Sequence, residues 1–194
     1  SAPLRARWLG TVPYLEALAV QEGLFQRGAE QHLLLLEHPH VFTYGPRTDL
    51  TNVRVAPASV GADFVAVKRG GDVTYHGPGQ LVGYPIVNVV NALGAADHVC
   101  AVQRVVVRAL QRLGLASVGC LPDYPGVWVD PDGPNPRKIC AIGVRLSKGR
   151  TMHGFALNVS TDLRYMREYI VPCGIADKPV TSLAEEFAAA GREL

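Results

Sequence analysis

The spacing of apolar and polar residues predicts three helices in this chain. Apolar positions recur at helical spacing in residues 14–27, which follow Pro13 and end at Gly28. The pattern is clearest in residues 97–113, where five aliphatic residues lie three or four positions apart. Residues 182–190 begin with Ser182 and carry Glu185 three positions later, which is the pattern of a capping box.

Short aliphatic runs predict the strands between these helices. Residues 32–37 form such a run, residues 64–68 alternate weakly, and residues 81–90 are interrupted by Pro85, which favours an edge position or a bulge. Residues 126–130 and 138–146 suit a hairpin, and residues 152–160 return after a turn at Lys148-Gly149. The order of elements predicts a mixed α/β (α+β) fold with a largely antiparallel central sheet flanked by helices.

Composition narrows the class of protein. The chain has 194 residues, 48% hydrophobic and 19% charged, and we expect residues 1–194 to form one globular domain with its own core. A net charge of only +2 and the lack of any long basic run argue against nucleic acid as a partner. The longest purely aliphatic run, residues 33–36, is far shorter than the roughly 18 residues of a membrane span. We expect a monomer that does not enter the membrane.

The cysteines are widely spaced. Cys100, Cys120, Cys140 and Cys173 form no C-x-x-C pair, so we expect four reduced thiols in a cytoplasmic protein rather than a disulfide framework. His38 and His40 lie close together, but no thiol or carboxylate spacing completes a metal site, and we expect none.

The densest group of unusual residues is RGGDVTYHGPGQ, residues 69–80. Its four glycines permit a tight double turn between strands, and they also permit the backbone to approach a ligand closely. The segment matches neither a P-loop nor a dinucleotide-binding motif. Arg69 either belongs to such a ligand-binding loop or forms a structural ion pair. His76 lies within the same loop.

Two residues on predicted strands have two interpretations each. Strict alternation would place Lys138 on one face with the apolar residues Cys140, Ile142, Val144 and Leu146. The methylene groups of Lys138 then pack on this apolar face while the ammonium stays in water, or the amine is partly desolvated and available for proton transfer. His153 shares a face with Phe155 and Leu157, and is either a core histidine or flanks a pocket with His76.

Cys173 lies in a Pro-Cys-Gly turn. A cysteine in such a turn is more accessible than one within a helix or strand, and it reacts as a nucleophile when a nearby base or cation favours its thiolate. An unreactive loop thiol is the alternative.

The motifs together resemble one family. EHPHVFTYG, RGGDVTYHGPGQ, KICAIG, MHGFALNV and PCGI occur in the order found in bacterial lipoyl/octanoyl transferases, over residues 37–183. The chain departs from the family pattern at Cys140, where a small residue such as Ala is usual, and at His40, where Pro is common.

The resemblance implies a fold related to the catalytic core of biotin and lipoate protein ligases, and a catalytic dyad of Cys173 and Lys138. It implies transfer of an octanoyl group from octanoyl-acyl carrier protein, through a cysteine thioester, to a lysine of lipoyl domains. The acceptors would be the E2 subunits of 2-oxoacid dehydrogenases and the H protein of the glycine cleavage system, and no ATP or other cofactor is implied. The implied substrate-binding residues are Arg69, Gly70, Gly71, Asp72, Val73, Thr74, Tyr75, His76, Ala141, Ile142, Gly143, His153, Gly154, Phe155 and Ala156.

Two other functions fit the same motifs. An ATP-dependent lipoate or biotin ligase would need no cysteine, and a catalytically silent module would only bind lipoyl domains or acyl carrier protein. A cysteine hydrolase lacks the Cys-His-Asn signature it would need.

Overall fold

A computed structural model describes residues 3–69, 71–89 and 94–194. The strands are β1 (Leu4–Thr11), β2 (Gln31–Glu37), β3 (Val41–Tyr44), β4 (Asp63–Ala66), β5 (Thr74–His76), β6 (Gln80–Ile86), β7 (Val118–Leu121), β8 (Tyr124–Val129), β9 (Arg137–Ser147) and β10 (Arg150–Asn158). The helices are α1 (Tyr14–Arg27), α2 (Ala95–Arg112), α3 (Arg164–Arg167) and α4 (Leu183–Ala189), with 3₁₀ turns η1 (Leu50–Asn52), η2 (Pro57–Val60) and η3 (Pro172–Gly174). Within the described residues, no helix is both long and apolar enough to cross a bilayer.

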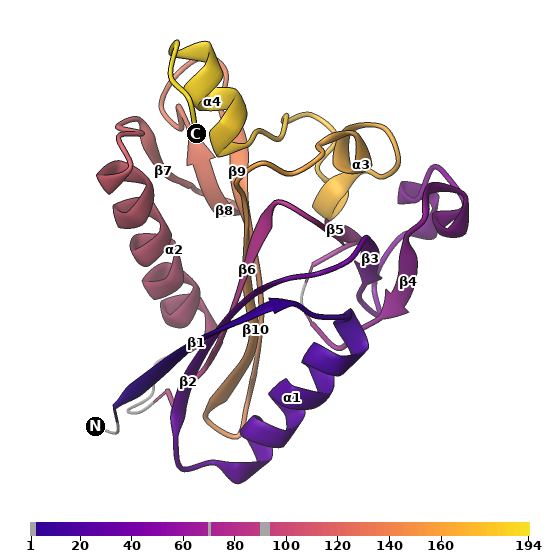
Figure 1. The fold of residues 1–194 in the computed structure, drawn as a ribbon, viewed down its shortest axis with the longest axis vertical. Helices are drawn as coiled ribbons and strands as arrows, with labels where there is room; N and C mark the ends of the chain where they lie inside the picture. Colours follow the sequence, from indigo (N-terminus) through magenta and orange to yellow (C-terminus); the bar gives the residue numbers. More distant parts are fainter. Residues whose placement is uncertain (1–2, 70, 90–93) are drawn as a thin grey trace.

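A seven-stranded sheet in the order β1-β2-β6-β10-β9-β8-β7 forms the centre of the molecule. In this sheet, as far as the described residues show, β1 and β2 pair in parallel and the other neighbours are antiparallel. A second sheet, β4-β3-β5, lies beside it (Figure 1). The predicted mixed fold with a largely antiparallel central sheet is confirmed.

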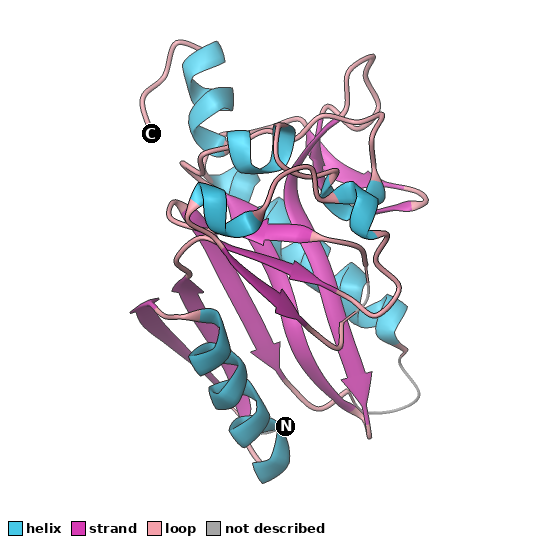
Figure 2. Cartoon of the chain, turned by 90° about the vertical axis from the view of Figure 1, so that its right-hand side faces the viewer, coloured by secondary structure: helices cyan, strands magenta, loops and turns pink. Residues whose placement is uncertain are grey.

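The helices cover both faces of the large sheet because successive residues of a strand point to opposite faces. On β10, Ala156 packs in the core beneath α1, and the next residue, Leu157, packs in the core beneath α2 and α4. Figure 2 shows α1 in front of the strands and α2 behind them. The small sheet lies on the α1 side, where Val41 packs against Tyr14 and Phe42 packs against Met166 of α3.

The predicted helices are confirmed, with α1 covering residues 14–27 and Ser182 capping α4 through a hydrogen bond from Glu185 N to its Oγ. The predicted hairpins β8–β9 and β9–β10 are also present. The edge position expected at Pro85 is wrong, because β6 lies in the middle of the large sheet; Val90, at the end of that predicted strand, lies outside the described residues. The sequence pattern did not predict β1, β3, β5 or β7.

Candidate active site

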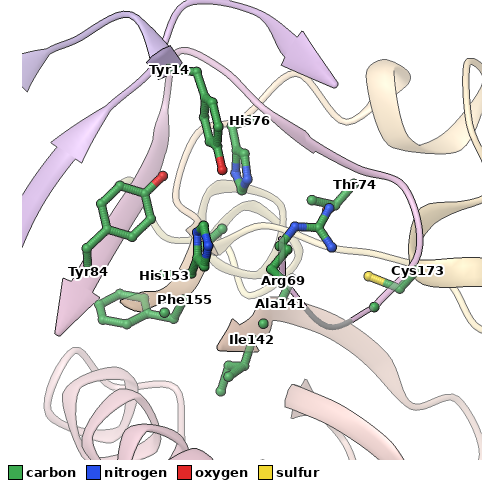
Figure 3. A pocket seen from close by; sticks show the side chains of 14 residues that line it. Tyr14, Arg69, Thr74, His76, Tyr84, Ala141, Ile142, His153, Phe155 and Cys173 are labelled. Atoms are coloured by element: carbon green, nitrogen blue, oxygen red, sulfur yellow. The ribbon is translucent and has the colours of Figure 1, made fainter. Parts of the chain in front are cut away.

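A pocket lies between α1, the small sheet and the face of the large sheet that α1 covers (Figure 3). It contains about 470 Å³ of empty space, including the solvent at its mouth. We call it the central pocket. Its lining residues are Tyr14, Arg69, Gly71, Thr74, His76, Tyr84, Ala141, Ile142, Gly143, His153, Gly154, Phe155, Ala156 and Cys173.

The structure therefore brings most of the predicted site residues together, including His76 and His153, which flank the same pocket. Four predicted residues that the structure describes are not among its lining, and one of them, Lys138, lines a neighbouring cavity described below. Val73 and Tyr75 are fully buried in the core of the small sheet, and the Asp72 carboxylate bonds to Asn52 Nδ2 and Val73 N. Gly70 lies outside the described residues. Tyr14 and Tyr84 were missed because each occupies an ordinary position in its helix or strand.

The central pocket forms where the ladder between β6 and β10 is interrupted. Paired residues run from Gln80–Asn158 to Gly83–Phe155 and resume at Asn88–Arg150. Pro85 in the gap has no N–H to donate. Opposite it, His153 has a left-handed φ of 58°, and its N–H bonds instead to Gln21 Oε1 of α1, at 2.8 Å. The ladder is thus interrupted opposite the proline, in a central strand, but the register is the same on both sides of the interruption, so the bulge expected as the alternative to an edge position is not found there either.

Gly154 is required by this narrow gap. A Cβ at this position would lie 2.1 Å from the carbonyl oxygen of Gly83, which is backbone and cannot move aside cheaply. We expect Gly154→Ala to lower the free energy of unfolding by about 2–3 kcal/mol and to reduce activity. The matched control is Gly23→Ala in α1, where a Cβ meets nothing within 4 Å; it should stabilise the protein by about 0.5–1 kcal/mol. Urea denaturation of both variants tests this, and equal stability would contradict it.

Histidines and tyrosines at one end of the pocket form a neutral cluster. His38 Nδ1 donates to the carbonyl of Val12 (2.7 Å), so its Nε2 accepts from the Tyr84 hydroxyl (2.7 Å). Burial lowers the pKa of His38 to about 4, and burial together with the neighbouring His38 lowers that of His76 to about 3. Burial also lowers the pKa of His153 to about 4 and raises that of Tyr14 to about 12. All these groups are uncharged at neutral pH, which suits an uncharged ligand.

Arg69 supplies the positive charge of the central pocket. Its Nη2 donates to the carbonyl oxygen and the Oγ1 of Thr43, both at 2.8 Å, and its Nη1 donates to the carbonyl oxygen of Asp72 at 3.0 Å. Burial lowers the pKa of Arg69, and a negative charge on the nearby Cys173 sulfur opposes that shift most strongly. The guanidinium stays charged at neutral pH and lies within electrostatic reach of Cys173 (Figure 3).

Lys138 faces the α1 side of the sheet because of a β-bulge. Val127 pairs with Cys140 and Trp128 pairs with Lys138, so Ile139 is an additional residue in β9. The expected sharing of a face between Lys138 and Cys140 is therefore wrong. Cys140 packs in the core beneath α2, whereas the Lys138 ammonium lies 4.9 Å from the ring centroid of Trp128.

Lys138 and Cys173 line one cavity, which we call the inner cavity. Its lining residues are Thr74, Gln80, Lys138, Ala141, Ala156, Asn158, Met166, Pro172, Cys173 and Val180. It shares Thr74, Ala141, Ala156 and Cys173 with the central pocket, so the two adjoin at the thiol. Lys138 is 7% exposed.

Cys173 has an unusual backbone conformation. Its φ of 57° is in the left-handed region, which costs a non-glycine residue about 1–3 kcal/mol. A hydrogen bond from its N–H to the carbonyl of Val73, 2.8 Å long, holds the turn against the segment that leads into β5. The following Gly174 is also left-handed, at 68°. The strained turn directs the thiol to the boundary of the two cavities.

A buried chain of hydrogen bonds connects the two cavities. His76 Nδ1 donates to Gln80 Oε1 (2.7 Å), and Gln80 Nε2 donates to Asn158 Oδ1 (3.0 Å). Asn158 Nδ2 donates to the carbonyl of Thr181 (3.1 Å), whose own N–H donates to the carbonyl of Lys138 (2.8 Å). The chain fixes the backbone of Lys138 relative to His76.

The fold and site define a lipoyl-ligase-type catalytic domain. Residues 13–192 match the lipoyl protein ligase A/B catalytic domain family, and the chain belongs to this family. Among curated relatives, an octanoyltransferase of Solibacter usitatus is 48% identical over 186 residues, covering 92% of this chain and 81% of that protein. An octanoyltransferase of Bacteroides fragilis is 44% identical over 189 residues, covering 91% and 85%.

Solved structures show the same fold at low sequence identity. A bipartite lipoate protein ligase from Thermoplasma acidophilum superposes with a TM-score of 0.78 at 18% identity, covering 95% of this chain and 76% of that one. A biotin protein ligase from Aquifex aeolicus gives a TM-score of 0.52 at 16% identity, covering 98% and 62%. The expected relation to the biotin and lipoate ligase fold is confirmed.

Proposed function

We propose that this protein is an octanoyltransferase that moves a medium-chain acyl group from octanoyl-acyl carrier protein to a lysine of lipoyl domains. The relatives named octanoyltransferase support the reaction, and the ligases are related in fold alone. The main structural support for this chemistry is that Cys173 and Lys138 line the same cavity, which adjoins the central pocket with its neutral rings. In this proposal residues 1–194 act as one cytoplasmic, monomeric catalytic domain. The acceptors are lipoyl domains of 2-oxoacid dehydrogenase E2 subunits and the glycine cleavage H protein.

The first half-reaction acylates the enzyme. The Lys138 amine accepts the proton of the Cys173 thiol, and the thiolate attacks the thioester carbonyl of the donor. The bond between the acyl carbon and the carrier's sulfur breaks, and the departing thiolate takes the proton from Lys138. Arg69 favours the anionic states because its positive charge lies near Cys173. The acyl chain occupies the central pocket, between the glycine backbone and the neutral rings.

The second half-reaction transfers the acyl group. The ε-amine of the acceptor lysine attacks the acyl carbon, and the bond to the Cys173 sulfur breaks as the amide forms. Lys138 accepts the proton that the amine loses and returns it to the thiolate. The donor thioester is already activated, so the sequence of steps needs no ATP.

Intact-protein mass spectrometry after mixing with octanoyl-acyl carrier protein, without ATP, tests the proposal. We expect one octanoyl increment on Cys173 that disappears when a lipoyl domain is added. Acceptor modification that requires free octanoate and ATP would instead favour a ligase. Binding of carrier or acceptor without any covalent change would favour a silent module.

The hydrogen-bond chain makes Asn158 a positioning residue for Lys138. Asn158→Leu removes both side-chain bonds and leaves Gln80 Nε2 and the carbonyl of Thr181 without this partner. We expect kcat to fall about tenfold with little change in KM, measured well below the unfolding temperature. The control is Thr161→Val, which removes one hydrogen bond to the carbonyl of Gly79, 3.2 Å long, and should leave kcat near wild type. Equal losses of kcat in both variants would mean that Asn158 acts only through general stability.

A further inference from the structure

A third cavity lies beside the turn that carries Cys173. It contains about 460 Å³ of empty space, including open solvent, and lies between α3, the segment that leads to α4, and Arg54. We call it the cationic cavity. Its lining residues are Arg54, Met166, Arg167, Ile170, Val171, Pro172, Ile175, Ala176, Lys178, Pro179 and Val180.

The cationic cavity adjoins the inner cavity, with which it shares Met166, Pro172 and Val180. The inner cavity in turn adjoins the central pocket at Cys173. The three spaces therefore follow one another in order. The first is lined mainly by neutral groups, the second contains the thiol and Lys138, and the third has three cationic side chains among apolar ones.

The charges at the third space favour an anion. Its lining includes Arg54, Arg167 and Lys178 and, among the described residues, no carboxylate. The positive charge of Arg167 is partly neutralised, because its Nη2 lies 2.7 Å from Oε2 of Glu185, a residue that is not part of the cavity lining. The Lys178 ammonium lies 4.9 Å from the ring centroid of Tyr124 and 4.0 Å from the exposed carboxylate of Asp177. These contacts keep Lys178 at the cavity and leave a net positive charge there.

We propose that the cationic cavity binds the phosphate of the donor's phosphopantetheine arm. The inference rests on the proposed function. A donor of this class consists, in order, of an apolar acyl chain, a thioester, and a long arm that ends in a phosphodiester. The three adjoining spaces have matching chemistry in the same order. Arg54 and Lys178 form charge-assisted contacts to the phosphate, and the arm passes Pro172 to bring the thioester to Cys173.

Two small donors that differ only in the phosphate test this assignment. They are octanoyl-4′-phosphopantetheine and octanoyl-pantetheine, with the rate of Cys173 acylation followed by mass spectrometry. We expect the wild-type protein to prefer the phosphate-bearing donor about tenfold in kcat/KM. Arg54→Glu and Lys178→Gln should each lower this ratio towards one. Arg108→Glu, an exposed residue of α2 on the opposite face of the sheet, should retain the wild-type ratio.

The outcomes separate this inference from the proposed function. Equal rates for the two donors in the wild-type protein, or a ratio unchanged by both Arg54→Glu and Lys178→Gln, would overturn the phosphate site while acylation of Cys173 still stood. Failure of both donors to acylate Cys173 would overturn the proposed function itself. Inhibition by ATP that Arg54→Glu relieves, without a donor preference, would assign the cavity to a nucleotide phosphate and overturn the donor assignment.

Discussion

A Cys173→Ala variant is expected to form no acyl-enzyme and to lose activity by a factor on the order of 10³ or more, because the acyl group then has no sulfur to which it can bind. The other cysteines cannot replace it. Cys140 is buried in the core beneath α2, and burial raises the pKa of its thiol to about 12. Cys100 and Cys120 are exposed and lie on α2 and β7, away from the central pocket. Mass spectrometry with octanoyl-acyl carrier protein measures the increment directly.

Two further variants control this result. Cys100→Ala should acylate like the wild-type protein. Cys173→Gly should be as inactive as Cys173→Ala but at least as stable, because glycine adopts the left-handed φ of 57° without the strain that a side chain imposes. Thermal unfolding compares the three proteins. Turnover near the wild-type rate in Cys173→Ala would exclude the covalent mechanism.

The helices and paired strands of this fold are largely predictable because their signals are local. Residues 14–27 have helical spacing and a glycine stop, and α1 occupies those residues. The predicted strand 138–146 lies within β9. In contrast, β1 was not predicted. It is an edge strand, and most of its residues are exposed. Its sequence therefore lacks the alternation of apolar and polar residues by which a half-buried strand is recognised.

The grouping of the candidate site residues was predictable from the sequence, but their geometry was not. The motif at residues 69–80 and the resemblance indicated the residues around Cys173. The direction of Lys138 depends on an additional residue in β9 opposite β8, and pairing between strands is not encoded in the spacing within one strand. The roles of Tyr84 and His38 likewise arise from a contact between residues 46 positions apart. Such features depend on tertiary packing.

Replacing Lys138 by Met is expected to slow both half-reactions by about 100-fold or more. Methionine fills a similar volume beside Trp128 but cannot accept a proton from the Cys173 thiol or from the acceptor amine. Single-turnover mixing with octanoyl-acyl carrier protein measures acylation, and mixing the isolated acyl-enzyme with a lipoyl domain measures transfer. Lys68→Met, an exposed lysine outside all three cavities, is the matched control and should keep both rates.

A second measurement distinguishes proton transfer from packing. Lys138→Ala leaves space in the inner cavity, and added ethylamine should restore part of both rates if an amine is what the site requires, whereas a lost packing contact would not respond to a base in solution. A defect confined to the transfer step would show that another group activates Cys173. Arg69 would then be the first candidate, since its guanidinium is a cation within electrostatic reach of that thiol. The mechanism would then rest on stabilising the thiolate by charge, with Lys138 acting only on the acceptor amine.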